Sequence, residues 1–374
     1  MGRILDLTNL AAIYGTRLLV EGGHDVIRVE SPQGDEIRHL GPFVGDTLGL
    51  EHGVYHRYLN AGKRSLSLDP ASAAGREVLL ALAARSDAIV ASASLPIEPD
   101  ELAATNRGLS IVVVEDGTPE LCLAARTGLL SLVGRPGRAP LQLGGHLIYA
   151  NPGLYVGLAV QLALMQAGRT GVGQRVTVSV EQCMESMLEQ AMIEYTFTGK
   201  GVERRGNRGT VTATSGALPC KDGYWLLSLI HRDEGWLQLM DWMQDPVLMA
   251  DPSLVHEENR HKQRDFILDR IEQWASQYTR TELVAEAQRR HIPASPISLP
   301  VDTIGDPQLQ ARGFFAAVED PEAGRVMLPR GPIANVLNRT VGLAPRLGQD
   351  NTSILDELGY SRLQQQALME SGAL

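Results

Sequence analysis

Two short segments of the chain carry cations next to glycine, in a pattern that suits the binding of an anion. Residues 60–65 (Asn-Ala-Gly-Lys-Arg-Ser) place Lys63 and Arg64 directly before an expected strand. Residues 202–208 (Val-Glu-Arg-Arg-Gly-Asn-Arg) form a second basic patch. Backbone N–H groups at a glycine, together with Lys or Arg side chains, bind phosphate well. The first segment is equally compatible with a solvated turn, and the second with an exposed linker or a subunit contact.

Several common catalytic and cofactor motifs are missing from the sequence. The first strand-to-helix turn, residues 7–12, has no Gly-x-Gly-x-x-Gly, so a dinucleotide site would lack its phosphate cradle. The sequence also has no Gly-x-Ser-x-Gly elbow, Walker loop or His-Glu-x-x-His pair. At His231, His256 and His261 no cluster of carboxylates or cysteines completes a metal site. We therefore expect no bound metal.

Composition and charge exclude further classes of protein. The chain of 374 residues has 34 Lys and Arg against 44 Asp and Glu, a net charge of −10, which argues against broad binding of nucleic acid or anionic membranes. No stretch approaches the ~20 unbroken apolar residues of a membrane span, and residues 1–6 become charged too early for a signal peptide. Cys122, Cys183 and Cys220 form no disulfide framework, and the first two lie in apolar helical stretches typical of core thiols. The sequence predicts a cytoplasmic globular protein.

Alternating strand and helix patterns in the first half of the chain predict a parallel α/β sheet. Residues 3–7 and 25–30 have strand patterns on either side of an apolar helix at 11–21, which makes a βαβ unit with a right-handed crossover. The pattern continues with strands at 65–69, 87–91, 109–115 and 175–180, and with helices at 71–85, 121–133, 153–166 and 181–195.

The sequence changes in character near residue 198. Residues 199–219 are rich in Gly, Arg, Thr and Asn, which predicts a crossing linker between domains. All four tryptophans fall within residues 220–325, which we expect to form a small domain. Residues 1–198 are then the N-terminal part of a large domain, to which residues 326–374 return.

Several segments taken in order resemble the class III CoA-transferases, the family that includes formyl-CoA transferase, carnitine CoA-transferase and the α-methylacyl-CoA racemases. The similarity covers nearly the whole chain. No single motif is specific, but six or more in the right order are. The matching segments are residues 4–7, 23–35, 60–69, 127–131, 169–174, 292–296, 306–315 and 344–348.

This resemblance implies both a fold and a reaction. The fold is α/β, with a Rossmann-like large domain formed by both chain ends, a smaller inserted α+β domain, and two chains interlocked as a dimer. The reaction moves CoA between carboxylic acids, with coenzyme A thioesters as substrates and no permanently bound cofactor. In the family an aspartate attacks the thioester, because a carboxylate is both a nucleophile and, once acylated, a good leaving group.

The family's aspartate has no counterpart in this sequence. Alignment back from Gly171 through Gly153 puts its position at Tyr149, or at Asn151 if the register shifts by two. A phenol is not ionised near neutral pH, and an amide is not a nucleophile. Residues 121–180 contain no Asp or Glu. We therefore expect no catalytic residue in this chain.

Two other departures from the family pattern concern the acyl side of the site. The loop after the strand at 109–115 is cut to residues 116–120, so the histidine and aspartate of a racemase are also missing. The Glu-Asn-Phe-like segment that lines the CoA pocket in relatives is here residues 91–94 (Ala-Ser-Ala-Ser). Three cations on the nucleotide side persist, and they are interpreted as vestigial contacts to CoA: Arg38, Lys63 and Arg64.

These losses predict the non-catalytic subunit of a heteromeric CoA-transferase, paired with a paralogous chain that supplies the aspartate. The benzylsuccinate CoA-transferases of anaerobic toluene degradation have two different subunits, which suggests succinyl-CoA and an aryl-substituted succinate as substrates. One alternative is an independently active transferase or acyl-CoA racemase with a displaced acid. Glu181 is the next acid along the chain, although its position predicts a first-turn carboxylate stabilised by the helix dipole. Another alternative is a CoA-ester binding protein without a transfer role.

Overall fold

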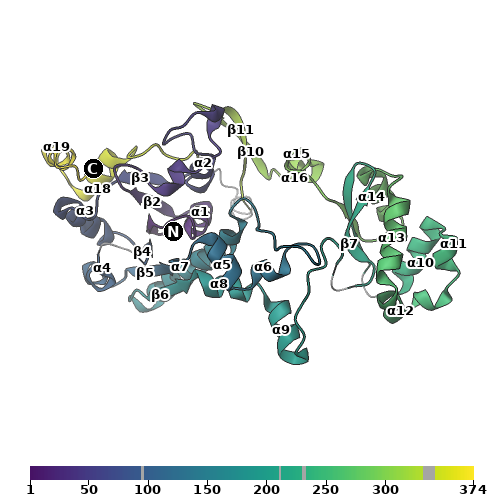
Figure 1. Cartoon of the computed structure of the whole chain (residues 1–374). Coiled ribbons are helices and arrows are strands. Elements are labelled where there is room, and N and C mark those ends of the chain that lie inside the picture. Colours follow the sequence, from purple (N-terminus) through teal and green to yellow (C-terminus); the bar gives the residue numbers. More distant parts are fainter. Residues whose placement is uncertain (94–96, 210–211, 230–232, 332–341) are drawn as a thin grey trace. The chain divides into compact units, whose positions relative to one another are not determined.

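The computed structural model describes residues 1–93, 97–209, 212–229, 233–331 and 342–374 (Figure 1). The chain folds into two compact units. The larger unit consists of Met1–Leu129, Gln142–Ile193 and Asp306–Leu374, and the smaller unit of Leu130–Leu141 and Glu194–Gly305. Both chain ends therefore belong to the larger unit, as expected. The bounds of these units differ from the domain bounds expected from the sequence, which were 1–198, 199–219, 220–325 and 326–374. The expected domain bounds stay predictions.

A six-stranded parallel sheet forms the centre of the larger unit. Its strands are β1 (Arg3–Leu7), β2 (Asp25–Glu30), β3 (Arg64–Ser67), β4 (Ala88–Ser92), β5 (Ser110–Glu115) and β6 (Arg175–Ser179). They lie in the order β3-β2-β1-β4-β5-β6, which is the Rossmann order and confirms the predicted fold class. The strand succession reverses between β1 and β4. Open α/β sheets bind ligands at the carboxyl ends of the strands beside such a reversal.

Helices cover both faces of this sheet, so the residues of β1 to β5 are mostly buried. On one face α1 (Ile13–Glu21) packs against α7 (Ala150–Thr170), and α7 also contacts β4, β5 and β6. On the other face α3 (Ala73–Ala83), α18 (Asn351–Leu358) and α19 (Arg362–Glu370) share an apolar core with the strands. The other helical segments of this unit are η1 (Glu36–His39), η2 (Val44–Asp46), α2 (Val54–Leu59), α4 (Pro99–Thr105), α5 (Glu120–Arg126), η3 (Leu147–Tyr149), α8 (Val180–Ser186) and α16 (Pro307–Ala311).

The C-terminal segment completes the larger unit at the edge of the sheet. Asp350 accepts a hydrogen bond from the backbone N–H of Ser65 at 2.8 Å, and Asn351 accepts one from Ser67 at 2.9 Å. These side chains therefore satisfy donors of the edge strand β3 that have no further strand beside them. A hairpin of β10 (Phe315–Asp320) and β11 (Gly324–Pro329) precedes this segment.

The smaller unit has a three-stranded antiparallel sheet in the order β7-β8-β9, formed by β7 (Ser215–Cys220), β8 (Gly223–Ser228) and β9 (Ala294–Pro296). All four tryptophans lie in this unit, and the rings of Trp242 and Trp274 meet edge to face with centroids 4.7 Å apart. The strand β7 begins within the predicted linker. The helices of this unit are α10 (Asp233–Met243), α11 (Pro246–Met249), η4 (Pro252–Val255), α12 (Glu257–Lys262), α13 (Arg264–Ala275), α14 (Arg280–Arg289) and α15 (Pro300–Ile304).

Two expected helices are each divided in two. The helix expected at 121–133 is α5 followed by α6 (Leu129–Leu132), because Gly128 between them adopts a φ of +89°. The helix expected at 181–195 is α8 followed by α9 (Glu189–Thr198). Cys183 is buried as predicted, but Cys122 is exposed, so that prediction was wrong. The buried residues of α5 are Leu123 and Ala124, which places Cys122 on its outer side.

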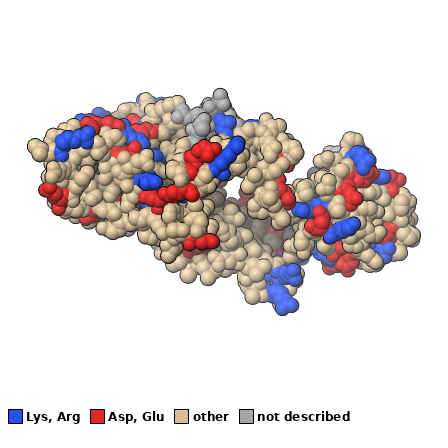
Figure 2. Space-filling view, turned by 90° about the horizontal axis from the view of Figure 1, so that it is seen from above, with Lys and Arg blue, Asp and Glu red and all other residues tan. Residues whose placement is uncertain are grey.

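One helical stretch among the described residues, Leu147–Thr170, is long and apolar enough to cross a membrane by length and composition. It lies largely within α7, which packs on α1 and on the sheet of the larger unit through buried residues such as Val156 and Val160. These contacts are typical of a core helix. On the face that Figure 2 shows, acidic and basic side chains are interspersed, with wide uncharged areas between them.

Candidate functional site

Lys63 is buried near the carboxyl end of β1, with its ammonium group surrounded by oxygen atoms. Its Nζ lies 2.7 Å from Oδ2 of Asp6. It also donates to Oγ1 of Thr16 at 2.9 Å and to Oδ1 of Asn60 at 3.0 Å, so all three of its donors are used within the chain. Burial lowers the pKa of Lys63 to about 8, although the charge of Asp6 opposes this shift. The predicted contact of Lys63 with a CoA nucleotide stays a prediction.

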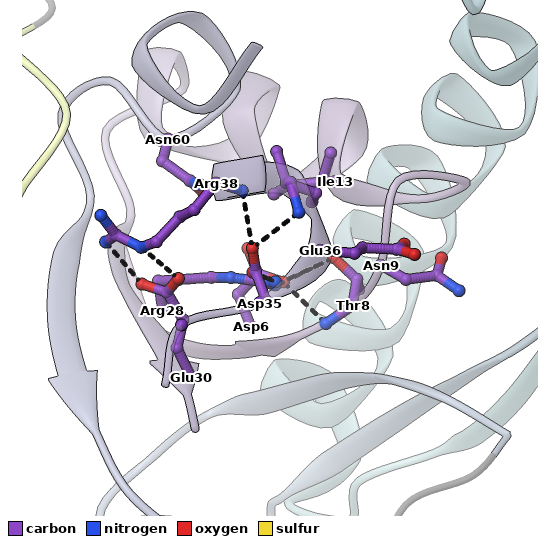
Figure 3. Close-up of polar contacts among 12 residues, drawn as sticks. Asp6, Thr8, Asn9, Ile13, Arg28, Glu30, Asp35, Glu36, Arg38 and Asn60 are labelled. Carbon is purple, nitrogen blue, oxygen red and sulfur yellow. Dashed lines mark hydrogen bonds and ion pairs between the residues drawn. The ribbon is translucent and has the colours of Figure 1, made fainter. Parts of the chain in front are cut away.

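Asp6 is the acidic centre of this cluster. Besides Lys63 it accepts hydrogen bonds from Nη1 of Arg28 at 2.9 Å and from Oγ1 of Thr8 at 2.6 Å. Burial by itself would raise the pKa of Asp6, but Lys63 and Arg28 together hold it well below its usual range. Arg28 also pairs with Asp35, so the cluster extends from β1 to the start of η1 (Figure 3). These ion pairs hold β1 and the start of η1 together, and every charge in the cluster has an opposite charge beside it.

Arg38 and Arg64, the other predicted nucleotide contacts, also pair with carboxylates of this chain. Nε and Nη2 of the buried Arg38 bind the carboxylate of Glu30 at 2.6 and 2.8 Å, and Nη1 binds Glu51 at 2.9 Å. Figure 3 shows the two-pronged contact between Arg38 and Glu30. Arg64 pairs with Glu357 of α18 at 2.7 Å. Each of these guanidinium groups therefore holds a part of the larger unit, and their proposed role in CoA binding is untested.

Tyr149 ends η3 directly before α7 and is half-buried. Burial raises the pKa of its phenol to about 12, and the nearby charges of Glu120, Glu36 and Asp116 add to this shift. Tyr149 is therefore un-ionised at neutral pH. Asn151 has a structural role instead, because its Nδ2 donates to the carbonyl oxygen of Cys183 at 2.6 Å.

The three carboxylates near Tyr149 come from separate segments of the larger unit. Asp116 follows β5 and accepts hydrogen bonds from Asn9 Nδ2 and, at 2.9 Å, from Ser92 Oγ. Glu120 lies 2.6 Å from Nδ1 of His146, whose backbone has a φ of +54°. Figure 3 shows Asn9 and Glu36 pointing away from the Asp6 cluster, and Glu36 accepts a hydrogen bond from the backbone N–H of Leu10 at 3.3 Å. Residues 121–180 lack acids, but the fold brings acids from outside that range toward Tyr149.

Sequence reasoning missed Asp116 and its two hydrogen-bond donors, Asn9 and Ser92, although a signal for them was present. Asn9, Ser92 and Asp116 each lie at or just after the carboxyl end of a strand, namely β1, β4 and β5. These three strands are neighbours in the sheet, and parallel strands bring their carboxyl ends to one edge. The sequence alone did not give the strand order, and without it these three residues could not be placed together.

Glu181 lies in the first turn of α8, as predicted, and Ser179 caps that helix by accepting from the N–H of Gln182. Glu181 pairs with Nη2 of Arg126 at 2.9 Å. Together with Asp116 it lines a cavity of about 150 Å³. The cavity is small beside a CoA ester, so it admits at most a small acid or water.

The described residues contain no group of three or more His, Cys, Asp or Glu side chains that could hold a metal ion. His256 lies 3.8 Å from Asp233, and His261 lies 3.3 Å from Glu257. His231 lies outside the described residues.

Comparison with known proteins identifies the family. The chain matches the model of CoA-transferase family III over residues 2–115 and 117–351. It therefore belongs to this family, in agreement with the order of motifs in its sequence.

Individual relatives are similar over almost the whole length of both chains. The chain is 28% identical to the succinyl-CoA:(R)-benzylsuccinate CoA-transferase subunit BbsE of Thauera aromatica, over 100% of this chain and 97% of that one. It is 28% identical to a succinyl-CoA:mesaconate CoA-transferase of Haloarcula marismortui, over 96% and 95% of the two chains. It is 26% identical to the alpha subunit of a succinyl-CoA–L-malate CoA-transferase of Chloroflexus aurantiacus, over 95% and 87%.

Solved structures of similar proteins have the same fold over nearly the whole chain. A CaiB/BaiF family protein from Brucella suis has a TM-score of 0.83 and 27% identity, over 95% of this chain and 98% of that one. The protein Rv3272 of Mycobacterium tuberculosis has the same fold, with a TM-score of 0.78 and 21% identity, over 94% and 97%.

Proposed function

We propose that this chain is the non-catalytic subunit of a heteromeric class III CoA-transferase, acting on succinyl-CoA and an aryl-substituted succinate. The observation that supports the proposal is the state of Tyr149, at the position where we expect the family's aspartate, or Asn151 if the register shifts by two. With a pKa of about 12, the phenol of Tyr149 is protonated at neutral pH and is a poor nucleophile. Two relatives, from Thauera aromatica and Chloroflexus aurantiacus, are named as subunits, which supports a paired assembly.

In this assembly a paralogous partner supplies the aspartate. Its carboxylate attacks the thioester carbonyl, CoA leaves as a thiolate, and a mixed anhydride forms. The thiolate then attacks the aspartyl carbonyl of the anhydride and releases the donor acid as its carboxylate. The acceptor carboxylate attacks the resulting aspartyl thioester and expels the thiolate, which attacks the acceptor carbonyl of this second anhydride to give the new CoA ester and the free aspartate. The chain described here threads through its partner and shapes the acid-binding side of the site, in the cytoplasm, with CoA thioesters and carboxylic acids as its small-molecule ligands.

An exposed apolar stripe on α7 supports the pairing with another chain. Leu154, Leu158, Leu162 and Met165 have 52 to 63% of their surface exposed, although they are large and apolar. Leu158 and Leu162 also line a cavity of about 410 Å³ beside the edge strand β6. Contiguous apolar surface of this kind marks protein interfaces. A paralogous chain in an interlocked dimer is the partner that we propose for it.

Turnover by the purified chain tests this proposal. The chain is expressed alone and together with a class III paralogue that retains the aspartate, and CoA transfer from succinyl-CoA to benzylsuccinate is measured. We expect turnover from the pair and none from the chain alone. Robust turnover by the chain alone would contradict a non-catalytic role.

The second candidate function is independent catalysis by a displaced acid. The observation that favours it is the proximity of Glu36, Asp116 and Glu120 to Tyr149. Under this alternative Asp116→Asn abolishes turnover by the lone chain, whereas Glu370→Gln on the exposed end of α19 has no effect. A third candidate, a CoA-ester binding protein, predicts binding of CoA by the lone chain without turnover in either preparation.

A further inference from the structure

A basic cleft in the smaller unit is lined by none of the residues of the candidate functional site. Its volume is about 1100 Å³, and its described lining residues include seven Lys or Arg and three Asp or Glu. This local excess of cations contrasts with the net charge of −10 for the whole chain. Part of the lining comes from the basic segment 202–208, which the sequence marks as a possible anion site.

Arg264 is the central observation in this cleft. The residue is only 7% exposed, and its Nη1 and Nη2 atoms are buried without a hydrogen-bond partner among the described residues. Burial lowers its pKa, and the positive charge of Arg205 adds to the effect. A buried guanidinium without partners costs free energy. Because both Nη atoms are closed to solvent, an anion recovers this cost through charge-assisted hydrogen bonds once the Arg264 side chain turns into the cleft.

The residues around Arg264 favour the same kind of ligand. Arg264 is the first residue of α13, whose N-cap residue Gln263 makes no side-chain cap hydrogen bond. The positive end of that helix dipole therefore adds to the field in the cleft. Arg205 and Arg138 also line the cleft and form no ion pair with the described residues. Arg208, in contrast, is neutralised by Asp265, Asp269 and Glu272.

Two aromatic side chains complete the cleft. Tyr224 and Phe266 line it and are 43% and 47% exposed. Exposed aromatic rings beside arginines offer a stacking surface for a base next to donors for its phosphates. We propose that this cleft binds a phosphorylated nucleotide, with Arg264 as the main phosphate donor and Arg205 as a second one. The nucleotide end of a CoA ester and a free nucleotide share this chemistry.

We test the proposal by calorimetric titration and by thermal unfolding. Both use the full chain, in complex with its partner where the two co-purify. The probes are adenosine 3′,5′-bisphosphate, ATP and inorganic pyrophosphate. We expect the nucleotides to bind and to raise Tm, with pyrophosphate weaker because it lacks a base. A preference for the bisphosphate identifies the CoA end as the source, and a preference for ATP identifies a free nucleotide.

The variants separate binding from folding. Arg264→Gln weakens nucleotide binding by about tenfold or more, because two charge-assisted hydrogen bonds are lost. Its Tm without ligand stays equal to or above that of the wild type, because an unpartnered buried charge is removed. Arg205→Ser weakens binding less, and Arg289→Gln, at an exposed arginine outside the cleft, leaves it unchanged. The proposal is overturned if no probe binds, or if Arg264→Gln binds the nucleotides as the wild type does.

Discussion

At the scale of single residues, the buried pair of Lys63 and Asp6 organises the crevice beside β1. Both side chains are fully enclosed, and each is the other's closest opposite charge. Removing one partner of a buried ion pair leaves an uncompensated charge, which costs far more than losing an exposed pair. The pair therefore matters to the stability of the larger unit mainly because neither charge can be removed without leaving the other one buried and short of a partner.

Substitution of Lys63 tests this interpretation. Lys63→Met is expected to lower the free energy of unfolding by about 3 kcal/mol, because Asp6 then keeps only Arg28, which it shares with Asp35. Arg64→Met, next along the chain and paired at the surface with Glu357, is expected to cost less than about 1 kcal/mol. Urea denaturation followed by circular dichroism gives both values. Equal losses for the two variants would show that the Lys63 pair has no special importance.

His56 gives the larger unit a dependence on pH. Burial, aided by the charge of Arg38, lowers the pKa of His56 to about 3, from an ordinary value of 6.5. Between these values the unfolded chain takes up a proton that the folded chain does not. Stability is therefore complete above pH 6.5 and falls below it, by up to about 1.4 kcal/mol per pH unit.

Comparison of variants isolates this contribution. His56→Gln keeps a side chain that reaches the carbonyl of Pro345 but does not titrate, so its unfolding free energy should vary less between pH 7 and pH 5. His261→Gln, at a largely exposed site, should follow the wild type. An unchanged pH slope in His56→Gln would rule out His56 as the source.

At the scale of elements, the contact between α1 and α7 positions the start of α7, and with it Tyr149. Gly15 and Gly153 face each other there, and a Cβ on Gly15 would collide with the carbonyl oxygen of Gly153. The glycines are therefore required by the close approach of two helices rather than by a turn.

An alanine pair tests the close contact. Gly15→Ala is expected to destabilise the protein by about 2 kcal/mol through overpacking. Gly168→Ala, on α7 where a Cβ would meet nothing within 4 Å, is expected to stabilise it by up to about 1 kcal/mol through helix propensity. Thermal unfolding of the two variants measures both effects. Stabilisation by Gly15→Ala would mean that the helices lie further apart.

The strands of the large sheet were predictable where they are short apolar runs buried on both faces, as in β4 and β5. Helix boundaries were harder, since the break at Gly128 depends on a left-handed backbone that an apolar run does not reveal. The acids near Tyr149 could not be found by alignment, because Glu36, Asp116 and Glu120 come from separate segments that the fold brings toward Tyr149. The partners of Arg38 and Lys63 were hidden for the same reason.

At the scale of the whole molecule, the family and the α/β fold followed from the order of the motifs, but the assembly depends on surfaces that motifs do not describe. The apolar stripe of α7 is the surface that we assign to the partner. Its residues recur every three or four positions and leave the opposite side of α7 to pack on the sheet.

Charged substitutions on this stripe test the assembly. The double variant Leu158→Glu and Leu162→Glu is expected to remain folded but to reduce association with the paralogous chain by at least about tenfold, because two charges would be buried at the interface. Leu363→Glu, at a still more exposed leucine of α19, serves as the control. Light scattering after size-exclusion chromatography reports the assembly. A complex that survives the double substitution would place the interface elsewhere.

The most direct test is to find which of the two chains carries the acyl group. The result decides between catalysis by the partner's aspartate and catalysis by a displaced acid of this chain. The assembled pair is incubated with succinyl-CoA, the covalent intermediate is trapped with hydroxylamine, and the modified residue is located by mass spectrometry. We predict a hydroxamate on an aspartate of the paralogous partner and none on this chain. A hydroxamate on Glu36, Asp116 or Glu120 would contradict the non-catalytic role and establish a displaced nucleophile.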